Sequence, residues 1–211
     1  MPQRNSSRNE VFFGAVLDSP RLVLRPYSEE RDLGMIAAML RDPVVSGPMG
    51  IPEPRITTED LRLVKESRAQ RTDAGDWTAF VRARHDEHEE VFAGEVGVVE
   101  WDSDMLVAEV FVAIIPDLGG SGYGREAVSR LTEHIFRSVP LACVRTQALI
   151  TNARALALAT SLGFRETGRR FVLPNLESGF VGGTAAVLDC RAHHFQPFSL
   201  SDEDNSRKKP R

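Results

Sequence analysis

The pattern of apolar and polar side chains near the N-terminal end of the chain predicts a strand, a helix and a loop. From Arg21 to Arg25, charged and apolar residues alternate as in a half-buried strand, and Pro26 ends this pattern. In the next segment, apolar residues recur at helical spacing and predict a helix. Residues 42–54 contain four prolines and two glycines, so we expect a loop there with neither helix nor strand.

The middle of the chain predicts a helix, a hairpin and a central strand. Thr57 and Asp60 are spaced like a capping box at the start of a helix. The runs 77–84 and 91–101 alternate as the two strands of an antiparallel hairpin do. Residues 106–115 are almost entirely apolar and rich in valine, which is typical of a buried strand.

The last third of the chain predicts two helices and three strands around one core. The helix after residue 124 carries Ala127, Val128, Leu131 and Ile135 on one face. The expected elements that follow are a strand over 144–150, a helix over 152–162 and strands over 169–173 and 184–190, the last two joined by a loop over 174–183. The polar segments 1–14 and 197–211 are expected to be flexible tails, which leaves a single domain over 15–196.

Composition narrows the class of protein. The 211 residues are 42% hydrophobic and 27% charged, as expected for a soluble globular domain, and no run approaches the ~20 apolar residues of a membrane span. The net charge of -4, without clustered lysine and arginine, argues against a nucleic-acid partner. Cys143 and Cys190 lack CxxC spacing, which favours a reduced, cytoplasmic protein. His85 and His88 lie in a charged turn without a third ligand, so no metal is expected.

A glycine-rich segment is the first candidate for chemistry. The expected central strand runs into Gly119-Gly-Ser-Gly-Tyr-Gly124 and then directly into a helix. This arrangement places backbone N–H groups and the positive end of a helix dipole around one concavity, which suits a phosphate. The glycine order matches neither a Rossmann fingerprint nor a P-loop, so a simple tight turn is the alternative.

Three segments together resemble the GNAT acyltransferases. Ala108-Glu-Val-Phe-Val-Ala-Ile114 followed by the glycines resembles motif A of that family, and the stretch from Asn152 to Gly168 resembles a later motif. Residues 19–27 resemble the opening strand of its RimJ/RimL-like branch. The resemblance implies an α/β GNAT fold, with a mixed, mainly antiparallel twisted sheet of six to seven strands and helices on both faces.

The resemblance also implies the substrates. The donor would be acetyl-CoA, the acceptor a primary amine on a peptide N-terminus or a small molecule, and the acetyl group would pass directly between them in a ternary complex. A homodimer through a sheet edge is compatible with this fold. The family's Arg or Gln at the first loop position is Gly119 here, which removes one side-chain contact to phosphate. The donor-binding residues implied are Phe111, Val112, Ala113, Ile114, Gly119, Gly120, Ser121, Gly122, Tyr123, Gly124, Arg125 and Asn152.

Three residues are candidates for catalysis. Glu109 is the single charge in the apolar strand and matches the family's general base, and burial would raise its pKa toward the useful range. The alternative is that Glu109 faces the polar side or pairs with an arginine, in which case Glu100 is the second choice. The resemblance gives the backbone N–H of Ala113 the task of polarising the thioester carbonyl. Asn152 either contacts the donor, caps the following helix, or does both.

The proton donor for the leaving thiolate has no assignment. The position of the family's tyrosine is Ala159, and that of the serine in some RimL-like enzymes is Ala155. Ser161 is a weak substitute. An acyl-CoA-binding sensor without catalysis is therefore the alternative function.

The acceptor side of the site is expected to be acidic. The proline-rich segment 42–54 and the loop 174–183 would form its walls. A protein N-terminus and a small-molecule amine rank equally as acceptors on this reading. The acids that would attract a cationic amine are Glu53, Asp102, Asp104 and Glu177.

Overall fold

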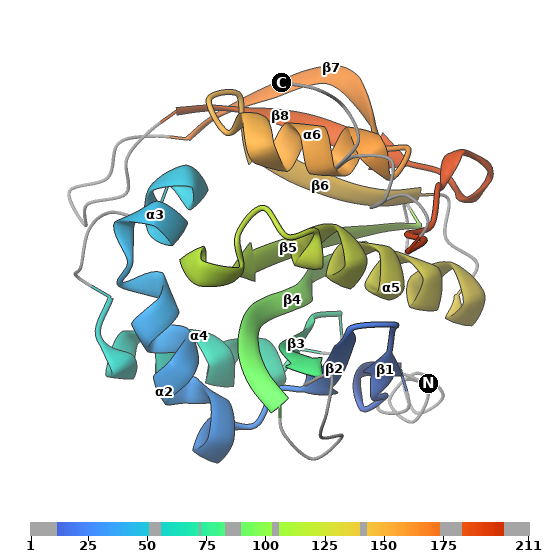
Figure 1. The fold of residues 1–211 in the computed structure, drawn as a ribbon. Coiled ribbons are helices and arrows are strands. Elements are labelled where there is room, and N and C mark those ends of the chain that lie inside the picture. Colours follow the sequence, from blue (N-terminus) through green and yellow to red (C-terminus); the bar gives the residue numbers. More distant parts are fainter. Residues whose placement is uncertain are drawn as a thin grey trace, which may run out of the picture.

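The protein forms one twisted sheet with helices on both faces (Figure 1). The computed structural model describes residues 12–50, 56–71, 73–82, 90–102, 106–139, 143–173 and 183–200. Eight strands follow the order β1-β2-β3-β4-β5-β6-β8-β7, and only β5 and β6 run parallel within that part of the chain. The strands are β1 (Leu17–Asp18), β2 (Leu22–Pro26), β3 (Gly75–Arg82), β4 (Glu90–Asp102), β5 (Val107–Ile114), β6 (Cys143–Leu149), β7 (Arg165–Leu173) and β8 (Gly183–Cys190).

The expected mixed, mainly antiparallel sheet is confirmed, with one strand more than predicted. The extra strand, β1, is two residues long and pairs with Val23 and Leu24 of β2. The helices are α2 (Glu29–Leu40), α3 (Pro43–Ser46), α4 (Thr58–Ala69), α5 (Tyr123–Ser138) and α6 (Ala153–Ser161), with 3₁₀ turns η1 (Gly47–Met49), η2 (Pro116–Leu118) and η3 (Ala192–His194). Figure 1 shows α5 and α6 in front of the sheet.

The prediction that residues 42–54 contain no helix is wrong for residues 43–49. The Asp42 carboxylate accepts a hydrogen bond from the backbone N–H of Val44 at 2.8 Å and caps α3. Pro43 stands in the first turn, where a helix needs no N–H donor and the fixed φ of proline is already helical. The prolines therefore start short helical turns here. Residues 51–55 lie outside the described part of the chain.

The main core lies between α5 and the sheet. Ala127, Val128, Leu131 and Ile135 are all buried in it, as their spacing predicts. The capping box at the start of α4 is also confirmed, because the N–H of Asp60 donates to the Thr57 hydroxyl at 3.0 Å and the N–H of Thr57 donates back to the Asp60 carboxylate at 2.9 Å.

The packed domain extends past both predicted boundaries, at 15 and at 196. Phe12 is 5% exposed, and its ring stacks on His134 with a centroid separation of 4.5 Å. At the other end, the backbone N–H of Phe198 donates to the hydroxyl of Ser129 on α5 at 2.7 Å. These contacts lie just outside the predicted boundaries, and the flexible tails stay a prediction.

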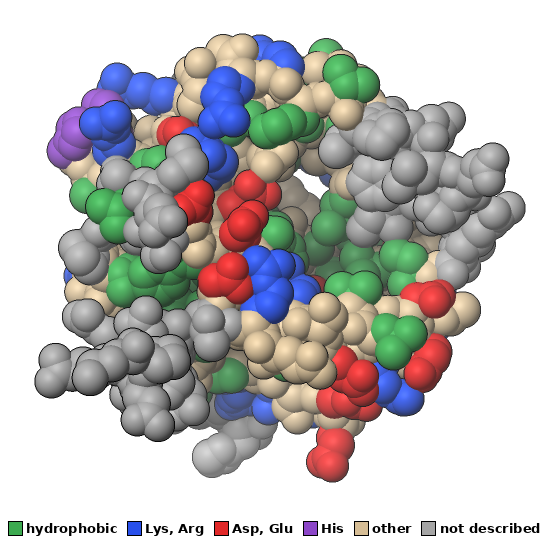
Figure 2. Space-filling model, turned by 180° about the vertical axis from the view of Figure 1, so that it is seen from behind, with side chains coloured by type: hydrophobic (Ala, Val, Ile, Leu, Met, Phe, Trp, Pro, Cys, Tyr) green, Lys and Arg blue, Asp and Glu red, His purple; other side chains and the backbone are tan. Residues whose placement is uncertain are grey.

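The face opposite α5 and α6 carries much charge. Acidic side chains and neighbouring basic ones gather near its middle, beside a hollow (Figure 2). Helix α4 packs on this face, and its described buried residues are only Leu61 and Lys65. Apolar packing alone is therefore too scarce to hold α4 on the sheet.

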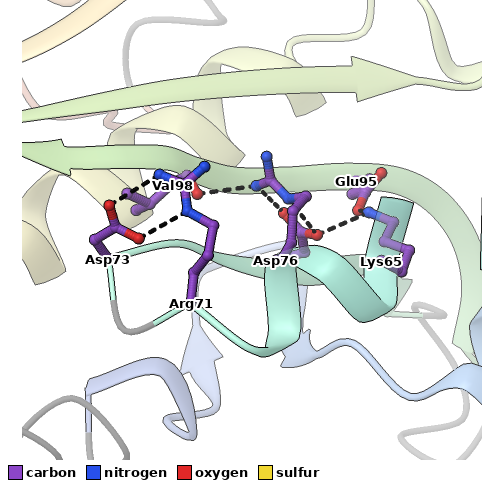
Figure 3. A network of polar contacts seen from close by, with 7 residues as sticks. Lys65, Arg71, Asp73, Asp76, Glu95 and Val98 are labelled. Carbon is purple, nitrogen blue, oxygen red and sulfur yellow. Dashed lines mark hydrogen bonds and ion pairs between the residues drawn. The ribbon is translucent and has the colours of Figure 1, made fainter. Parts of the chain in front are cut away.

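Buried ion pairs hold α4 instead (Figure 3). The ammonium group of Lys65 bonds to the carboxylates of Asp76 on β3, at 2.9 Å, and of Glu95 on β4. Arg68 donates to Asp76 at 2.5 Å and to the carbonyl of Val98 at 2.9 Å. Burial raises the pKa of Glu95 to about 7, although the Lys65 charge opposes this shift. Burial removes water from these charges, and the ion pairs that replace the water fix the position of α4 on the sheet.

Removing Lys65 should destabilise the protein in a pH-dependent way. Lys65→Met leaves Glu95 buried without its cation, which costs about 3–5 kcal/mol when the carboxyl is charged. In the variant, the folded-state pKa of Glu95 lies further above its unfolded value. The variant therefore loses stability as pH rises from the unfolded-state pKa of Glu95 to its folded-state pKa. The loss in free energy of unfolding relative to wild type is smaller at pH 5 than at pH 8. Chemical denaturation at both pH values measures this.

Arg62→Met is the matched control for this experiment. Arg62 lies on the same helix but pairs with Glu29 and Glu59 at the exposed surface. Its loss should cost only about 0–1 kcal/mol. A Lys65→Met deficit of the same size, or one that does not change with pH, would contradict the ion-pair explanation.

Candidate active site

A wedge opens in the sheet where β5 and β6 stop pairing. The two strands pair only from Val107 to Glu109 on β5 and from Cys143 to Arg145 on β6. Beyond that point β5 still pairs with β4, and β6 still pairs with β8. Each strand therefore presents a free edge to the other, and Glu109 lies at the apex of the wedge.

The wedge contains a cleft of about 230 Å³. Its lining is mostly apolar and comes from β5, β6, α6 and η1. Of the predicted donor-binding residues, Phe111, Val112 and Asn152 line it. A narrow apolar cleft with free strand edges on both sides suits an extended chain that carries amide groups.

The pairing of β4 with β5 decides which backbone N–H groups of β5 face the cleft. The N–H of Ile115 donates to the carbonyl of Ala93 on β4 at 2.9 Å. Backbone groups alternate in direction along an antiparallel strand, so the N–H of Ala113 also points toward β4. Beyond the last β5–β6 pair, the N–H groups directed at the cleft are those of Val112 and Ile114. The N–H of Ala113 therefore does not face the cleft, whereas that of its neighbour Val112 does; a role of either N–H at a thioester stays a prediction.

The glycine loop lies at the open end of the wedge. Gly120 and Gly122 have φ of 77° and 81°, the left-handed region that favours glycine. A Cβ added to Gly124 would meet Leu158 at 3.2 Å and Ile114 at 3.4 Å, which places the loop against both the cleft wall and β5. Within the described backbone, the N–H groups of Gly122, Tyr123 and Gly124 donate to no carbonyl. These donors at the N-terminus of α5 fit an anionic phosphate.

Glu109 is half-buried at the apex of the wedge. Its carboxylate accepts a hydrogen bond from the side-chain amide of Gln147 on β6 at 2.7 Å. Burial raises the pKa of Glu109 above its ordinary value, although the Gln147 bond and the Arg145 charge act in the opposite direction. The carboxylate is thus accessible, held in one orientation and easier to protonate than a surface glutamate.

Charged residues form a row across the sheet at the level of Glu109. Register places Glu100 on β4 and Arg145 on β6 on either side of it, and Asp189 on β8 beyond Arg145. Arg145 binds Asp189 through two hydrogen bonds, at 2.7 and 2.8 Å. Because Arg145 is engaged by Asp189, Glu109 is not neutralised by a close ion pair. Ala108 and Val110, the neighbours of Glu109 on β5, are buried in the core with α5, so the Glu109 side chain points to the opposite face of the sheet.

Of the two predicted roles of Asn152, the structure shows the helix cap. The side-chain oxygen of Asn152 accepts from the N–H of Ala155 at 3.1 Å and caps α6, as one reading expects. Its nitrogen donates to the carbonyl of Pro48 in η1 at 3.2 Å. Asn152 therefore ties the proline-rich segment to the cleft, and contact with a donor stays a prediction.

The structure also shows where the two positions lie at which the resemblance implies a proton donor. Ala155 and Ala159 both line the cleft, so the positions implied for serine and tyrosine face it with methyl groups. The Ser161 hydroxyl donates to the carbonyl of Leu158 at 2.7 Å and does not line the cleft.

Several other predictions concern residues beyond this site. Among the acids expected near the acceptor, Asp102 ends β4, whereas Glu53, Asp104 and Glu177 lie outside the described residues, as do the loop 174–182, His85 and His88. In the described ranges, no group of three or more His, Cys, Asp or Glu residues is placed to hold a metal ion. No described helix has the length and apolar character needed to cross a bilayer.

Two polar residues of the cleft were missed from the sequence. Gln147 holds Glu109, and the hydroxyl of Thr146 donates to the carbonyl of Val110 at 3.0 Å across the wedge. Both belong to β6, where the sequence shows an ordinary strand. Only the separation of β5 and β6 gives these residues a role.

Comparison with known proteins places this geometry in a family. A model of the acetyltransferase (GNAT) domain matches residues 21–165. The chain belongs to the GNAT acetyltransferase family. As a GNAT protein it is an acyltransferase, in agreement with the motifs at residues 108–124 and 152–168.

Solved structures show the same fold. A spermidine N-acetyltransferase from Vibrio cholerae in complex with CoA and spermine is 18% identical with a TM-score of 0.68, and the match covers 83% of this chain and 98% of that one. Mutant forms of the spermidine/spermine N-acetyltransferase from the same organism are 17% identical with a TM-score of 0.63, covering 90% of this chain and 100% of that one. No curated protein sequence matches the chain.

Asn152 allows a test of how the cleft is closed. Asn152→Asp keeps the side-chain oxygen that caps α6 but replaces the amide that donates to Pro48. Asn152→Ala loses both bonds and should cost about 1 kcal/mol for the cap alone. We expect Asn152→Asp to retain most of the stability, while hydrogen exchange at residues 47–50 becomes faster in both variants. Slow exchange in both would show that the Pro48 contact does not hold η1.

Proposed function

We propose that the protein is an acetyl-CoA-dependent N-acetyltransferase whose acceptor is a small cationic primary amine of the polyamine kind. The observation that carries the proposal is the position of Glu109, a half-buried carboxylate at the apex of the wedge between β5 and β6. The wedge contains the apolar cleft, and the phosphate-type loop lies against the cleft wall at Leu158. The exposed acid Glu100, which pairs with Glu109 across β4 and β5, supports a cationic acceptor. The similar enzyme that contains CoA and spermine supports the same choice.

The residues present fit the donor. The loop 119–124 offers backbone N–H groups for the phosphates, and the N–H of Val112 faces the cleft that would hold the extended arm. Acetyl-CoA supplies an activated acetyl thioester when it is bound. The apolar lining excludes water from this end of the cleft, which favours transfer to an amine over hydrolysis.

Glu109 is the proposed general base. An amine at neutral pH is mostly protonated, so the carboxylate must take a proton from it before the amine can attack. The raised pKa of Glu109 brings it closer to the range in which a base both accepts and releases a proton. Gln147 orients the carboxylate. Glu100, its exposed neighbour on β4, adds negative charge that attracts the acceptor without being buried in the site.

One observation favours the second candidate, a CoA-binding sensor. Ala155 and Ala159 place no proton donor in the cleft at the positions where the family resemblance implies one. A module that binds acyl-CoA without transferring its acyl group would tolerate this loss. Assignment to the RimJ/RimL-like branch, a cytoplasmic location and a homodimer stay predictions from the sequence.

Substitution of Glu109 tests the proposal. Glu109→Gln should lower kcat/KM for spermidine acetylation by about 10²–10⁴-fold and leave CoA affinity unchanged, because the base acts only in the chemical step. Calorimetry measures CoA binding, and thiol release measures transfer. Glu133→Gln, on the outer part of α5, is the control and should keep wild-type activity. CoA binding without release in the wild type would support the sensor, and transfer only to peptides would replace the polyamine acceptor.

The pH profile gives an independent check on the base. Gln147→Met removes the hydrogen bond that lowers the pKa of Glu109, so this pKa should rise. Activity requires the deprotonated carboxylate, so the acid limb of the kcat/KM profile should move to higher pH. An acid limb that stays in place would rule out Glu109 as the titrating base.

A further inference from the structure

The start of α5 is anchored to the segment before β2 by a buried carboxylate. Glu126 lies in the first turn of α5 and is 1% exposed. One of its oxygens accepts from the backbone N–H of Arg21 at 2.8 Å and from the hydroxyl of Ser19 at 2.7 Å, and the other accepts from the Arg21 Nε at 2.6 Å. Such charge-assisted bonds in a buried place are strong. The helix N-terminus therefore has one position relative to residues 19–21.

Arg21 extends this anchor to the glycine loop. Its Nη1 donates to the carbonyl of Ser121 at 3.0 Å, and its guanidinium lies over the ring of Tyr123, 4.6 Å from the centroid. A trans peptide points the carbonyl of one residue and the N–H of the next in opposite directions. By holding the Ser121 carbonyl, Arg21 therefore sets the direction of the Gly122 N–H, one of the donors without a backbone partner.

The segment after η3 packs over the guanidinium of Arg21. The Phe198 ring lies 5.1 Å from the Arg21 guanidinium carbon and 5.7 Å from that of Arg125. The Phe198 backbone is fixed to α5 by its bond to Ser129. Arg21 thus contacts the aromatic rings of Tyr123 and Phe198 and is only 20% exposed in its side chain.

The loop depends on this support because of its own composition. Residues 119–124 contain no lysine or arginine, so attraction of an anion there rests on backbone N–H groups and the helix dipole. Dipoles bind an anion only when they point at it, and left-handed glycines at 120 and 122 leave the backbone free to turn away. An external group must hold the loop in its binding shape.

We propose that Arg21 is a positioning residue for the donor's phosphates, and that Phe198 holds it in place. Arg21 acts on the loop through the Ser121 carbonyl, so that the N–H groups point at the anion before it arrives. The inference rests on the proposed function, since it takes CoA as the ligand of the loop. It assigns a role in donor binding to the start of β2 and to the C-terminal segment, which lie far apart in the sequence.

A comparison of two donors tests the proposal. Arg21→Gln should raise the Kd for CoA and the KM for acetyl-CoA about tenfold or more, the effect of losing one well-aligned hydrogen bond to a charged group. The kcat at saturating donor should stay within about twofold, because the reacting end is untouched. S-acetylpantetheine, which lacks the nucleotide and the pyrophosphate, should react equally well with wild type and variant.

A neighbouring arginine provides the control. Arg130 on α5 donates to the carbonyl of Asp18 at 2.8 Å and contacts the same N-terminal segment without reaching the loop. Arg130→Gln should leave the KM for acetyl-CoA unchanged. If Arg21→Gln does not fold, Phe198→Leu keeps the ion pair and should still raise the KM about two- to fivefold, as expected for the loss of a cation–π contact.

The outcomes separate this inference from the proposed function. Equal losses with acetyl-CoA and S-acetylpantetheine would show a purely structural role and overturn the inference. Unchanged CoA affinity in both Arg21→Gln and Phe198→Leu would also overturn it, while the proposed function stands. Failure of the wild type to bind CoA would overturn both.

Discussion

The active site depends on the point at which β5 and β6 stop pairing. Backbone N–H and C=O groups need partners, and a sheet normally supplies them on both sides of a central strand. Here the partnership ends after Glu109, although each strand continues along its other neighbour. The carbonyl of Val110 accepts from the Thr146 hydroxyl, and the edge groups of Val112 and Ile114 are left to the cleft. A gap in the hydrogen-bond ladder thus becomes a binding site, and the apex of the gap places the carboxylate.

The two ends of the wedge carry opposite electrostatic character, with backbone N–H donors at the open end and a carboxylate at the apex. At the open end, the loop presents backbone donors, and no cationic side chain lies within residues 119–124, so orientation carries the interaction. At the apex, the half-buried carboxylate of Glu109 lies next to the exposed Glu100 and faces the side of the sheet opposite α5. An anionic donor and a cationic acceptor would therefore approach from different directions and meet at Glu109. This separation of charge suits direct transfer between two bound substrates.

Polar bonds outside the Glu109 apex hold this geometry. The buried pairs of Lys65 and Arg68 keep α4 on the face of the sheet opposite α5 and α6, where α4 buries little apolar surface. The Asn152 amide ties η1 to the start of α6. In each case a polar bond, buried for Lys65 and exposed for Asn152, fixes one arrangement where apolar contacts would allow several. Preorganisation of this kind is what a transfer reaction between two bound partners requires.

Local patterns in the sequence determined the central strand, the glycine loop, the capping box of α4 and the buried face of α5. These features depend on spacing within one segment, so periodicity and turn chemistry were enough. The family motifs also pointed to Glu109. Only the tertiary structure decided that the N–H of Val112, and not that of Ala113, faces the cleft, that Gln147 holds Glu109, and that prolines 43 and 48 start helical turns. It alone brought Arg21 and Phe198 to the loop. These outcomes depend on strand register and on contacts between distant segments, which no local pattern encodes.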